Sequence, residues 1–274
     1  MSRFRSLFPG TRPVIGMLAL PPLPGYPTHP GMDALVEAAL ADLAALEAGG
    51  VDGALVENDF DQPHTMVGGP EIHAAMTRVT REVVARARIP IGVEVLLDDW
   101  RASLAIASAT GARFIRMDFF VDRVMTKCGP FEPDPAAVLE YRKRIGAEQV
   151  QLFADLQVKY TTPIGGPKPM EQSAREAETA GADAVIISGA ETGVGPTRDD
   201  LRAARASALP VIIGSGLTPE NAGALMPLAD GAIVGTSLRS GRSAGDRVVH
   251  VQVARLVAAV RAVDPAVVPS SRVT

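Results

Sequence analysis

The sequence predicts an α/β fold, a single (β/α)8 TIM barrel, and three observations lead to this prediction. Short runs rich in Val, Ile and Leu recur along the chain with few polar residues, as in strands that are covered on both faces. Helix-like segments separate the runs, and several end in Gly just before the next run, as in "ETAGADAVIIS". The 274 residues suit eight such units, since TIM barrels typically have about 250 residues. We expect one domain over residues 1–274, a barrel at about 12–263, and these strands: Val14–Leu20, Gly53–Glu57, Ile91–Leu96, Phe114–Asp118, Val150–Asp155, Ala184–Ser188, Val211–Gly214 and Ala232–Gly235.

The segments between the runs carry helix signals. Met32–Ala48 has Leu and Ala at three- and four-residue spacing, which gives a helix one apolar stripe. Other helix starts have a capping residue followed by Pro, or by an acid three positions on. Three such starts are Asp134 with Pro135, Thr197 with Asp200, and Thr218 with Pro219.

The first run leads directly into the Pro-rich stretch "LPPLPGYP". The alternative fold, a doubly wound open sheet, would usually have a Gly-rich nucleotide-binding loop at this point. Proline fixes φ and keeps the preceding residue extended, so we expect a stiff arm at the barrel rim. This arm would either wall the pocket between the first and eighth strands, with Leu20 and Leu23 packing and Tyr26 near the opening, or only seal the barrel top. The tail "DPAVVPSSRVT" is expected to fray.

Composition excludes several classes of function. The net charge of −4 and the 4% aromatic content disfavour a nucleic-acid or membrane-surface binder. No apolar run approaches the roughly 20 residues that a membrane span needs, and the N-terminus lacks the apolar region of a secretory signal. Cys128 is the only cysteine, which fits a reducing compartment. We expect a cytoplasmic protein that forms a homo-oligomer, because closed symmetric assemblies are common.

Acidic residues end four neighbouring predicted strands, where TIM barrels place their active sites. Buried carboxylates are costly unless they are paired, hydrogen-bonded or protonated. They could serve general acid/base catalysis or bind a divalent metal such as Mg²⁺, although no cofactor is certain. The structural alternative is salt bridges to Arg116 or Lys159. The candidates are Glu57 and Asp155 first, then Asp118, and Glu94, which could instead be a barrel-interior residue.

Glycine-rich pieces follow the last strands. The loops after strands seven and eight are the recurrent phosphate site of these barrels. "GSGLTPEN" also leads into a predicted helix start, whose free N–H groups and dipole would attract an anion. The expected phosphate-binding residues are Gly214, Ser215, Gly216, Gly235, Thr236 and Ser237, together with Gly193 after the sixth strand. The expected partner is thus a small phosphorylated substrate.

Three other side chains carry weaker chemistry. Lys159 could neutralise a carboxylate, hold an anion or form a Schiff base. His64 could join the acidic cluster or be a solvated loop residue. Cys128 has no evident base partner and is interpreted as an incidental thiol. No Cys/His spacing suggests structural zinc.

The chain resembles the BtpA/SgcQ family over roughly residues 12–263. The motifs that carry the resemblance are "VIGMLALPPLPG", "GVDGALVEND", "FADLQVKY" and "IIGSGLTPENAGALMPLADGAIVGTSL". The resemblance implies a ribulose-phosphate-binding type of TIM barrel. One group of that family is named for photosystem I biogenesis, and others accompany sugar-uptake genes. Ala19 and Tyr160 stand where the family pattern usually has His, which implies altered or lost chemistry, with His64 as a candidate replacement.

A looser likeness is to the tryptophan synthase alpha chain, in which a Glu, an Asp and a "TGV.G" loop are placed like Glu57, Asp61 and "ETGVG" here. Three hypotheses follow. The first is an enzyme that moves protons on a phosphorylated metabolite, as a lyase, aldolase or isomerase. The second is a non-catalytic assembly factor with an exposed patch away from the mouth. The third is a metal-dependent hydrolase, against which the scarcity of His at the strand ends counts.

Overall fold

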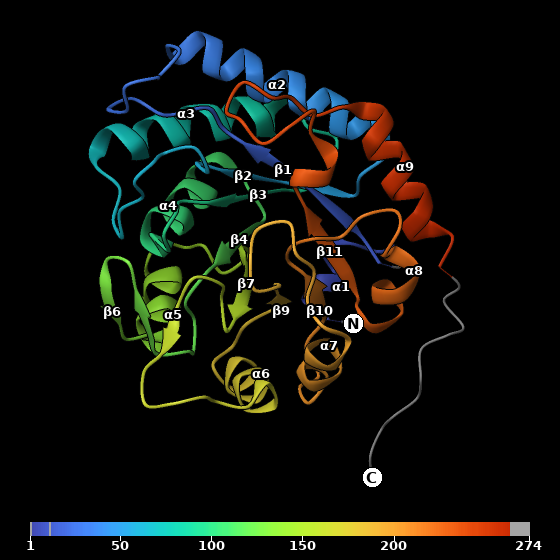
Figure 1. The fold of residues 1–274 in the computed structure, drawn as a ribbon. Coiled ribbons are helices and arrows are strands. Elements are labelled where there is room, and N and C mark those ends of the chain that lie inside the picture. The colour runs from blue at the N-terminus through green and yellow to red at the C-terminus, as the bar shows by residue number, and fades with distance from the viewer. Residues whose placement is uncertain (1, 11, 264–274) are drawn as a thin grey trace.

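The computed structural model describes residues 2–10 and 12–263 and contains a closed barrel of eight parallel strands. Helices surround the barrel (Figure 1), and the strands follow the order β1-β11-β10-β9-β7-β4-β3-β2. The predicted fold class is confirmed, and each predicted run overlaps one barrel strand, although β7 ends one residue later and β11 begins one residue earlier than predicted. The barrel strands are β1 (Val14–Ala19), β2 (Gly53–Glu57), β3 (Ile91–Glu94), β4 (Phe114–Met117), β7 (Gln151–Leu156), β9 (Ala184–Ile187), β10 (Val211–Ile213) and β11 (Gly231–Val234).

The helices alternate with the strands, as the sequence predicts. The helix predicted from Met32 runs one residue further, to Gly49, and ends at Gly50 in the left-handed conformation. The helices are α1 (Arg3–Leu7), α2 (Met32–Gly49), α3 (Pro70–Arg86), α4 (Trp100–Thr110), α5 (Pro135–Arg144), α6 (Met170–Thr179), α7 (Arg198–Ala204), α8 (Ala222–Leu225) and α9 (His250–Arg261), with short 3-10 helices η1 (Met226–Leu228) and η2 (Thr236–Leu238).

Two of the three predicted helix starts are confirmed. Asp134 caps α5, and Thr197 forms a reciprocal capping box with Asp200 at α7. The third prediction is wrong: α8 begins at Ala222 rather than Pro219, because Thr218 donates its N–H to Asn221 and the chain forms a turn first. This helix has only four residues, so it supplies little of the helix dipole that was expected to attract an anion at "GSGLTPEN".

Alternate residues of each barrel strand face two different cores. One set packs outward against the helices, and the other fills the barrel interior. Phe4 and Phe8 of α1 close the amino end of the interior, where Phe8 contacts Phe114 and Phe4 contacts Phe153. The inner core comprises Ile15, Met17, Leu55, Phe114, Phe153, Ala184, Ile186, Ile212 and Ile233 with these two phenylalanines.

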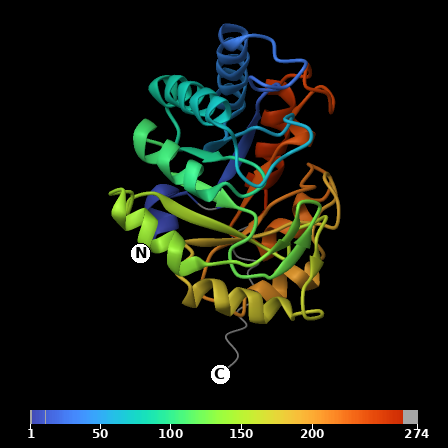
Figure 2. The ribbon, with the colours of Figure 1, turned by 90° about the vertical axis from the view of Figure 1, so that its left-hand side faces the viewer.

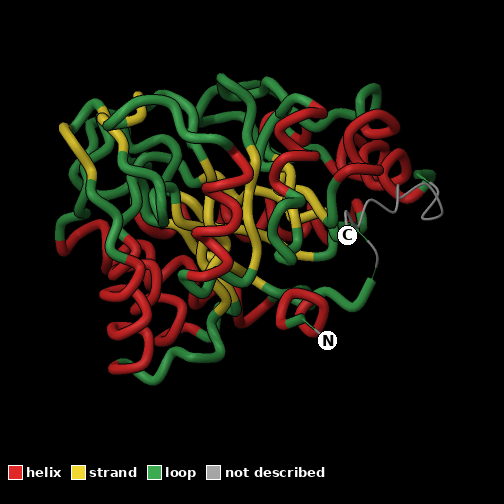
Figure 3. The backbone as a smooth tube through the Cα atoms, turned by 90° about the horizontal axis from the view of Figure 1, so that it is seen from below, coloured by secondary structure: helices red, strands yellow, loops and turns green. Residues whose placement is uncertain are grey.

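The loops at the carboxyl ends of the strands form the opposite end of the barrel. In Figure 2 the Pro-rich arm, the loop after β2 and the loops after β9 and β11 gather on the right, with α1 on the left. A small antiparallel sheet also lies at this end, opposite α1 (Figure 3), and consists of β5 (Val124–Thr126), β6 (Gly129–Phe131) and β8 (Thr162–Pro163). Its apolar side chains pack with those of neighbouring loops into a cluster that we call the roof: Met66, Leu97, Phe119, Val124, Phe131 and Val158.

Within the described residues, no helix combines the length and apolar character needed to cross a bilayer. The predicted fraying of "DPAVVPSSRVT" concerns residues 264–274, which lie outside the described residues.

Candidate active site

The carboxyl ends of the barrel strands carry a ring of inward-facing residues, which we call the mouth ring. Side chains alternate along a strand, so the residue two positions beyond an inner-core residue also faces inward. The strand register agrees, since Ala19 pairs with Glu57 and Glu57 with Glu94. The ring has two halves. The acidic half, from β2, β3, β4 and β7, consists of Glu57, Glu94, Arg116, Asp118 and Asp155; the small-residue half, from β9, β10, β11 and β1, consists of Ser188, Gly214, Gly235 and Ala19.

Arg116 lies at the centre of the acidic half and is paired with Asp155. Its Nε donates to Asp155 Oδ2 at 2.7 Å and its Nη2 to Oδ1 at 3.1 Å, which is the bidentate geometry that guanidinium and carboxylate prefer. Ser188 Oγ also donates to Asp155 Oδ1, at 3.2 Å. Both carboxylate oxygens of Asp155, a predicted acid/base residue, therefore accept hydrogen bonds. This is the salt bridge to Arg116 that the sequence allowed as the structural alternative.

Glu57 and Glu94 are buried beside Arg116 without a bidentate ion pair, and their carboxyl groups contact each other. Arg116 Nη1 is 3.9 Å from Glu57 Oε2, and Arg116 Nε is 3.8 Å from Glu94 Oε2. Burial, with the nearby Asp59, raises the pKa of Glu57 to about 7, although Arg116 opposes the shift. Burial raises the pKa of Glu94 well above its ordinary value, again against Arg116. Glu57 can therefore exchange a proton near neutral pH, and the raised pKa of Glu94 favours its protonated form. The place of Glu94 inside the barrel matches the interior reading of the sequence.

Two aspartates extend the acidic half. Burial raises the pKa of Asp118, and Arg116 and Lys159 oppose the shift. Asp98, which the sequence analysis missed, is 5% exposed, and burial together with Asp118 raises its pKa well above the ordinary value. Its backbone has φ of 80°, a conformation that non-glycine residues rarely adopt. The signal that could have found it is the Asp pair in "LLDDW", just after the third strand.

The donor set does not suit the divalent metal that the sequence left open. Within residues 2–10 and 12–263, no group of three or more His, Cys, Asp or Glu side chains is arranged to hold a metal ion.

The small-residue half is shaped by close backbone packing. Gly216 has φ of 66°, and a Cβ at this position would lie 2.0 Å from the backbone nitrogen of Gly195. A Cβ at Gly214 would meet Ser188 Oγ at 2.5 Å and would lie 3.7 Å from Asp155 Oδ1. Only glycine fits at these two positions, and the loop after β10 consequently begins directly beside the acidic half.

Two serines fasten the loops of this half to one another. Ser215 Oγ donates to Val194 O at 2.8 Å and accepts from Gly189 N at 3.0 Å, while Ser237 Oγ donates to Leu217 O at 2.8 Å. Their hydroxyl protons are thus used within the protein. Within the described residues, the backbone N–H groups of Ser215, Gly216 and Gly235 have no acceptor, so they are the donors that an anion could use.

Arg242 stands against the loop after β9, in which Gly193 has φ of 86°. A Cβ at Gly193 would lie 3.0 Å from Arg242 Nη2, so the guanidinium covers this turn. Nearby, the hydroxyl of Tyr160 accepts from Thr192 N at 2.9 Å and links the loops after β7 and β9. Arg242 was not a sequence candidate, because its position depends on how the loop after β11 folds.

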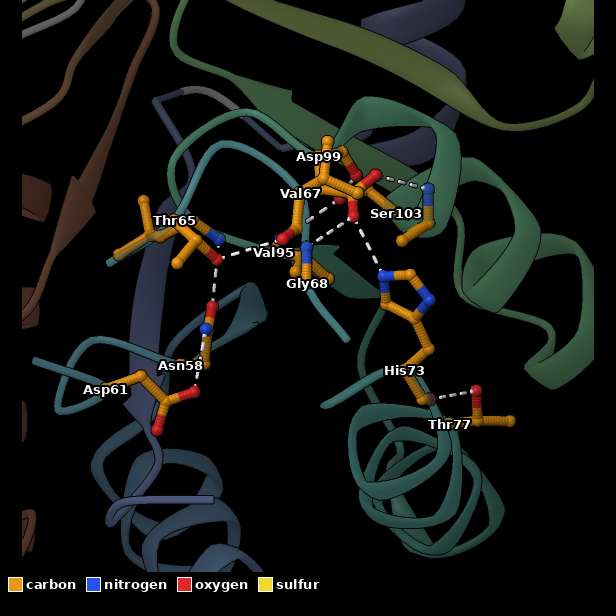
Figure 4. Close-up of polar contacts among 12 residues, drawn as sticks. Asn58, Asp61, Thr65, Val67, Gly68, His73, Thr77, Val95, Asp99 and Ser103 are labelled. Atoms are coloured by element: carbon orange, nitrogen blue, oxygen red, sulfur yellow. Dashed lines mark hydrogen bonds and ion pairs between the residues drawn. The ribbon is translucent and has the colours of Figure 1, made fainter. Parts of the chain in front are cut away.

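The Pro-rich arm is pinned to the loop after β2. Asn58 Nδ2 donates to Asp61 Oδ2 at 2.9 Å (Figure 4). Leu23 N donates to Asp61 Oδ1 at 2.8 Å, and Asn58 Oδ1 accepts from Leu96 N at 2.8 Å. Leu20 and Leu23 are buried as expected, and Tyr26 donates to Pro63 O. The arm therefore packs beside β2, while its prolines face α2 and the loop after β11 across a surface hollow of about 460 Å³.

Asp99 fixes the rest of the loop after β2. One carboxylate oxygen caps α4 at Ala102 N, and the other accepts from Gly68 N at 2.9 Å and from His73 Nε2 at 2.8 Å (Figure 4). His64 lies in the same loop, where Cys128 of the β5–β6 turn donates to its carbonyl. These contacts keep the roof in place over the acidic half.

Comparison with known proteins agrees with this architecture. A family model described as the BtpA family matches residues 10–262. "Photosystem I biogenesis protein BtpA" of Synechocystis sp. is 36% identical over 251 residues, which cover 90% of this chain and 87% of that protein. Tryptophan synthase from M. tuberculosis has a TM-score of 0.61 at 17% identity, covering 95% of this chain and 100% of that one. Thiamine phosphate pyrophosphorylase from Pyrococcus furiosus has a TM-score of 0.59 at 14% identity, covering 92% and 96%. The solved structures share the fold, and the family match over nearly the whole chain establishes that this protein belongs to the BtpA family.

Proposed function

We propose that this protein is an enzyme that moves a proton on a small phosphorylated metabolite, in the manner of a lyase, aldolase or isomerase. The observation that carries the proposal is Glu57, a buried carboxyl with a pKa of about 7 that faces the mouth beside Arg116. A base with a pKa near the working pH is the effective one for proton abstraction.

The small-residue half would hold the phosphate. The unused N–H groups of Ser215, Gly216 and Gly235 are donors, and Arg242 supplies positive charge near Gly193. Thr236 is the remaining hydroxyl candidate, since Ser215 and Ser237 fasten loops. The name of the structural neighbour thiamine phosphate pyrophosphorylase refers to a phosphate compound, which supports this reading at the level of fold analogy.

In the acidic half, we assign Glu57 the base role, and Asp155 becomes a positioning residue for Arg116. The positive charge of Lys159 lowers the pKa of Asp118 against the effect of burial, so Asp118 is the second acid/base candidate at the rim. Burial favours the neutral form of Glu94, and its hydrogen bond with Glu57 lowers the pKa of Glu57 against the effect of burial. A cytoplasmic location and a homo-oligomeric state remain parts of this proposal that rest on the sequence alone.

The test is a thermal-shift screen against phosphorylated metabolites, followed by turnover assays with each compound that binds. A ligand at one hundred times its Kd adds about 2.7 kcal/mol of apparent stability. With a substrate in hand, Glu57→Gln should lower kcat by roughly 10²–10⁴-fold, the usual contribution of a general base. Wild-type turnover by Glu57→Gln would show that another group takes the proton.

A second candidate, an assembly factor, is favoured by the name of the Synechocystis relative. That hypothesis expects an exposed apolar patch away from the mouth. Among the described residues, however, four of the six exposed large apolar side chains lie on the loops or the small sheet at the mouth end: Val67, Met125, Tyr160 and Val194. This rim could close on a substrate as readily as it could bind a protein. Stable co-purification of a membrane complex with a variant that binds no phosphate compound would favour the assembly role.

A further inference from the structure

Arg116 has donors that its ion pair does not use. Nε and Nη2 both donate to Asp155, at 2.7 and 3.1 Å. Among residues 2–10 and 12–263, Nη1 has no hydrogen-bond acceptor, although the side chain is 8% exposed. The guanidinium is therefore held rigidly at one edge and presents two unused N–H bonds at the other.

The unused donors face the proposed base. Arg116 Nη1 is 3.9 Å from Glu57 Oε2, and this oxygen is buried without a partner. The separation is too long for a hydrogen bond between them, which needs about 2.7–3.2 Å. An oxygen atom seated beside both could accept from Nη1 and also from a protonated Glu57.

The charge around this gap is compatible with a developing oxyanion. Asp155 pairs with Arg116, and burial raises the pKa values of Glu94, Asp98 and Asp118, which favours their uncharged forms. A proton on Glu57 lowers the negative charge facing the gap further. An oxyanion in the gap would meet a cation and a neutral acid rather than a row of carboxylates.

We propose that Arg116 is a catalytic residue that binds a carbonyl oxygen of the substrate, and that the substrate is a phosphate ester whose carbonyl lies next to the carbon that loses its proton. In the step, Glu57 takes the proton, and the C–H electron pair forms a C=C bond. The carbonyl π electrons move to the oxygen, which Arg116 Nη1 stabilises as the enolate. The two halves adjoin at this point, since a Cβ built at Gly214 would lie 3.7 Å from Asp155 Oδ1. This inference rests on the proposed phosphate-binding function and narrows its substrate class.

The test uses matched pairs of small phosphates, in which a carboxylate imitates the enolate oxygen. The pairs are 2-phosphoglycolate with ethyl phosphate, and 3-phosphoglycerate with glycerol 3-phosphate. In calorimetric titrations at pH 6.5, the carboxylate member of at least one pair should bind ten-fold or more tightly than its neutral partner. Arg116→Lys keeps the positive charge but loses the guanidinium group. It should abolish the tighter binding of the carboxylate member while leaving ethyl phosphate or glycerol 3-phosphate binding unchanged.

A second variant covers the case in which Arg116→Lys does not fold. Glu57 is faced by Asp59, Arg116, Glu94 and Asp118, and in the wild type the carboxylate advantage should shrink at least three-fold between pH 6 and pH 8 as Glu57 loses its proton. Glu57→Gln, which stays neutral, should keep the advantage at both pH values.

The outcomes separate the two proposals. If none of the phosphates binds, the proposed function fails. If the phosphates bind but no carboxylate has an advantage, or if Arg116→Lys keeps that advantage, the assignment of Arg116 is wrong while the phosphate site stands. An advantage in Glu57→Gln that still changes with pH would also overturn it.

Discussion

The two halves of the mouth ring use different parts of the polypeptide for their chemistry. In the acidic half, buried side chains from β2, β3, β4 and β7 include carboxyl groups with raised pKa values and an ion pair between Arg116 and Asp155. In the small-residue half, side chains are almost absent, and backbone N–H groups are presented by loops that pack too closely for any Cβ. One rim can therefore combine a proton-transfer surface with an anion-binding surface. The strands place the side chains of the first, and the close packing of the loops places the backbone N–H groups of the second.

The halves should respond differently to mutation. Stability in the acidic half depends on electrostatic pairing in a buried setting. Stability in the small-residue half depends on steric fit and on a few hydrogen bonds. Each prediction below changes one half and leaves the other as an internal reference.

The largest effect is expected at the Arg116–Asp155 pair. Asp155→Ala leaves a buried guanidinium without its bidentate partner, and we expect a loss of about 3–5 kcal/mol in the free energy of unfolding, measured with urea. Asp33→Ala is the matched control, because it breaks an exposed pair with Arg78 and should cost about 1 kcal/mol or less. Equal costs for the two variants would mean that the buried pair contributes no more than a surface pair.

The next effect is a pH dependence at Glu57. Its pKa is about 7 in the folded protein against an ordinary value of 4.5, so the folded state binds this proton more tightly than the unfolded chain. The resulting stability is fully present below pH 4.5 and is lost as the pH rises through 7, a change on the order of 3 kcal/mol. The free energy of unfolding of Glu57→Gln, measured with urea, should therefore rise relative to that of the wild type between pH 4 and pH 8.

Glu37→Gln, on the exposed face of α2, provides the control for that experiment. Its stability relative to wild type should stay constant over the same pH range. A parallel course for the two variants would indicate that Glu57 titrates like a surface carboxyl.

A steric prediction addresses the small-residue half. Gly216→Ala places a Cβ against Gly195 at a positive φ, and the free energy of unfolding should fall by about 1–3 kcal/mol. Phosphate binding should weaken at least ten-fold, while the pH dependence from Glu57 remains. Gly223→Ala has nothing within 4 Å and lies in α8, so it should be neutral or slightly stabilising. Equal behaviour of the two alanine variants would contradict the close packing of the loops.

Much of this layout could be predicted from the sequence, for a local reason. A barrel strand is an apolar run, and an acidic residue at its carboxyl end marks the mouth, so Glu57 and Asp155 could be identified without coordinates. The glycines after the seventh and eighth strands were found in the same way. The family resemblance, carried by several separate motifs, pointed to the same fold.

The remaining features depend on tertiary contacts. Asp98 enters the acidic half through a loop with an unusual φ, four residues beyond the end of β3. Arg242 reaches Gly193 only because the loop after β11 folds back over the mouth. The later start of α8 follows from the Asn221 side chain, which binds Thr218 N and Gly216 O and holds the preceding residues in a turn, a contact that spacing alone does not predict.

The smallest expected effect tests whether Ser215 fastens loops or binds phosphate. Ser215→Ala removes the bonds to Val194 O and Gly189 N, and the free energy of unfolding should fall by about 1–2 kcal/mol. Ser108→Ala, on α4, should change it by less than about 0.5 kcal/mol. If Ser215 only links the two loops, the phosphate affinity of Ser215→Ala should fall modestly. A protease should also cleave the loop after β9 faster in this variant than in the wild type. A large loss of phosphate affinity with unchanged stability would instead make the hydroxyl a direct ligand, and the small-residue half would then use a side chain after all.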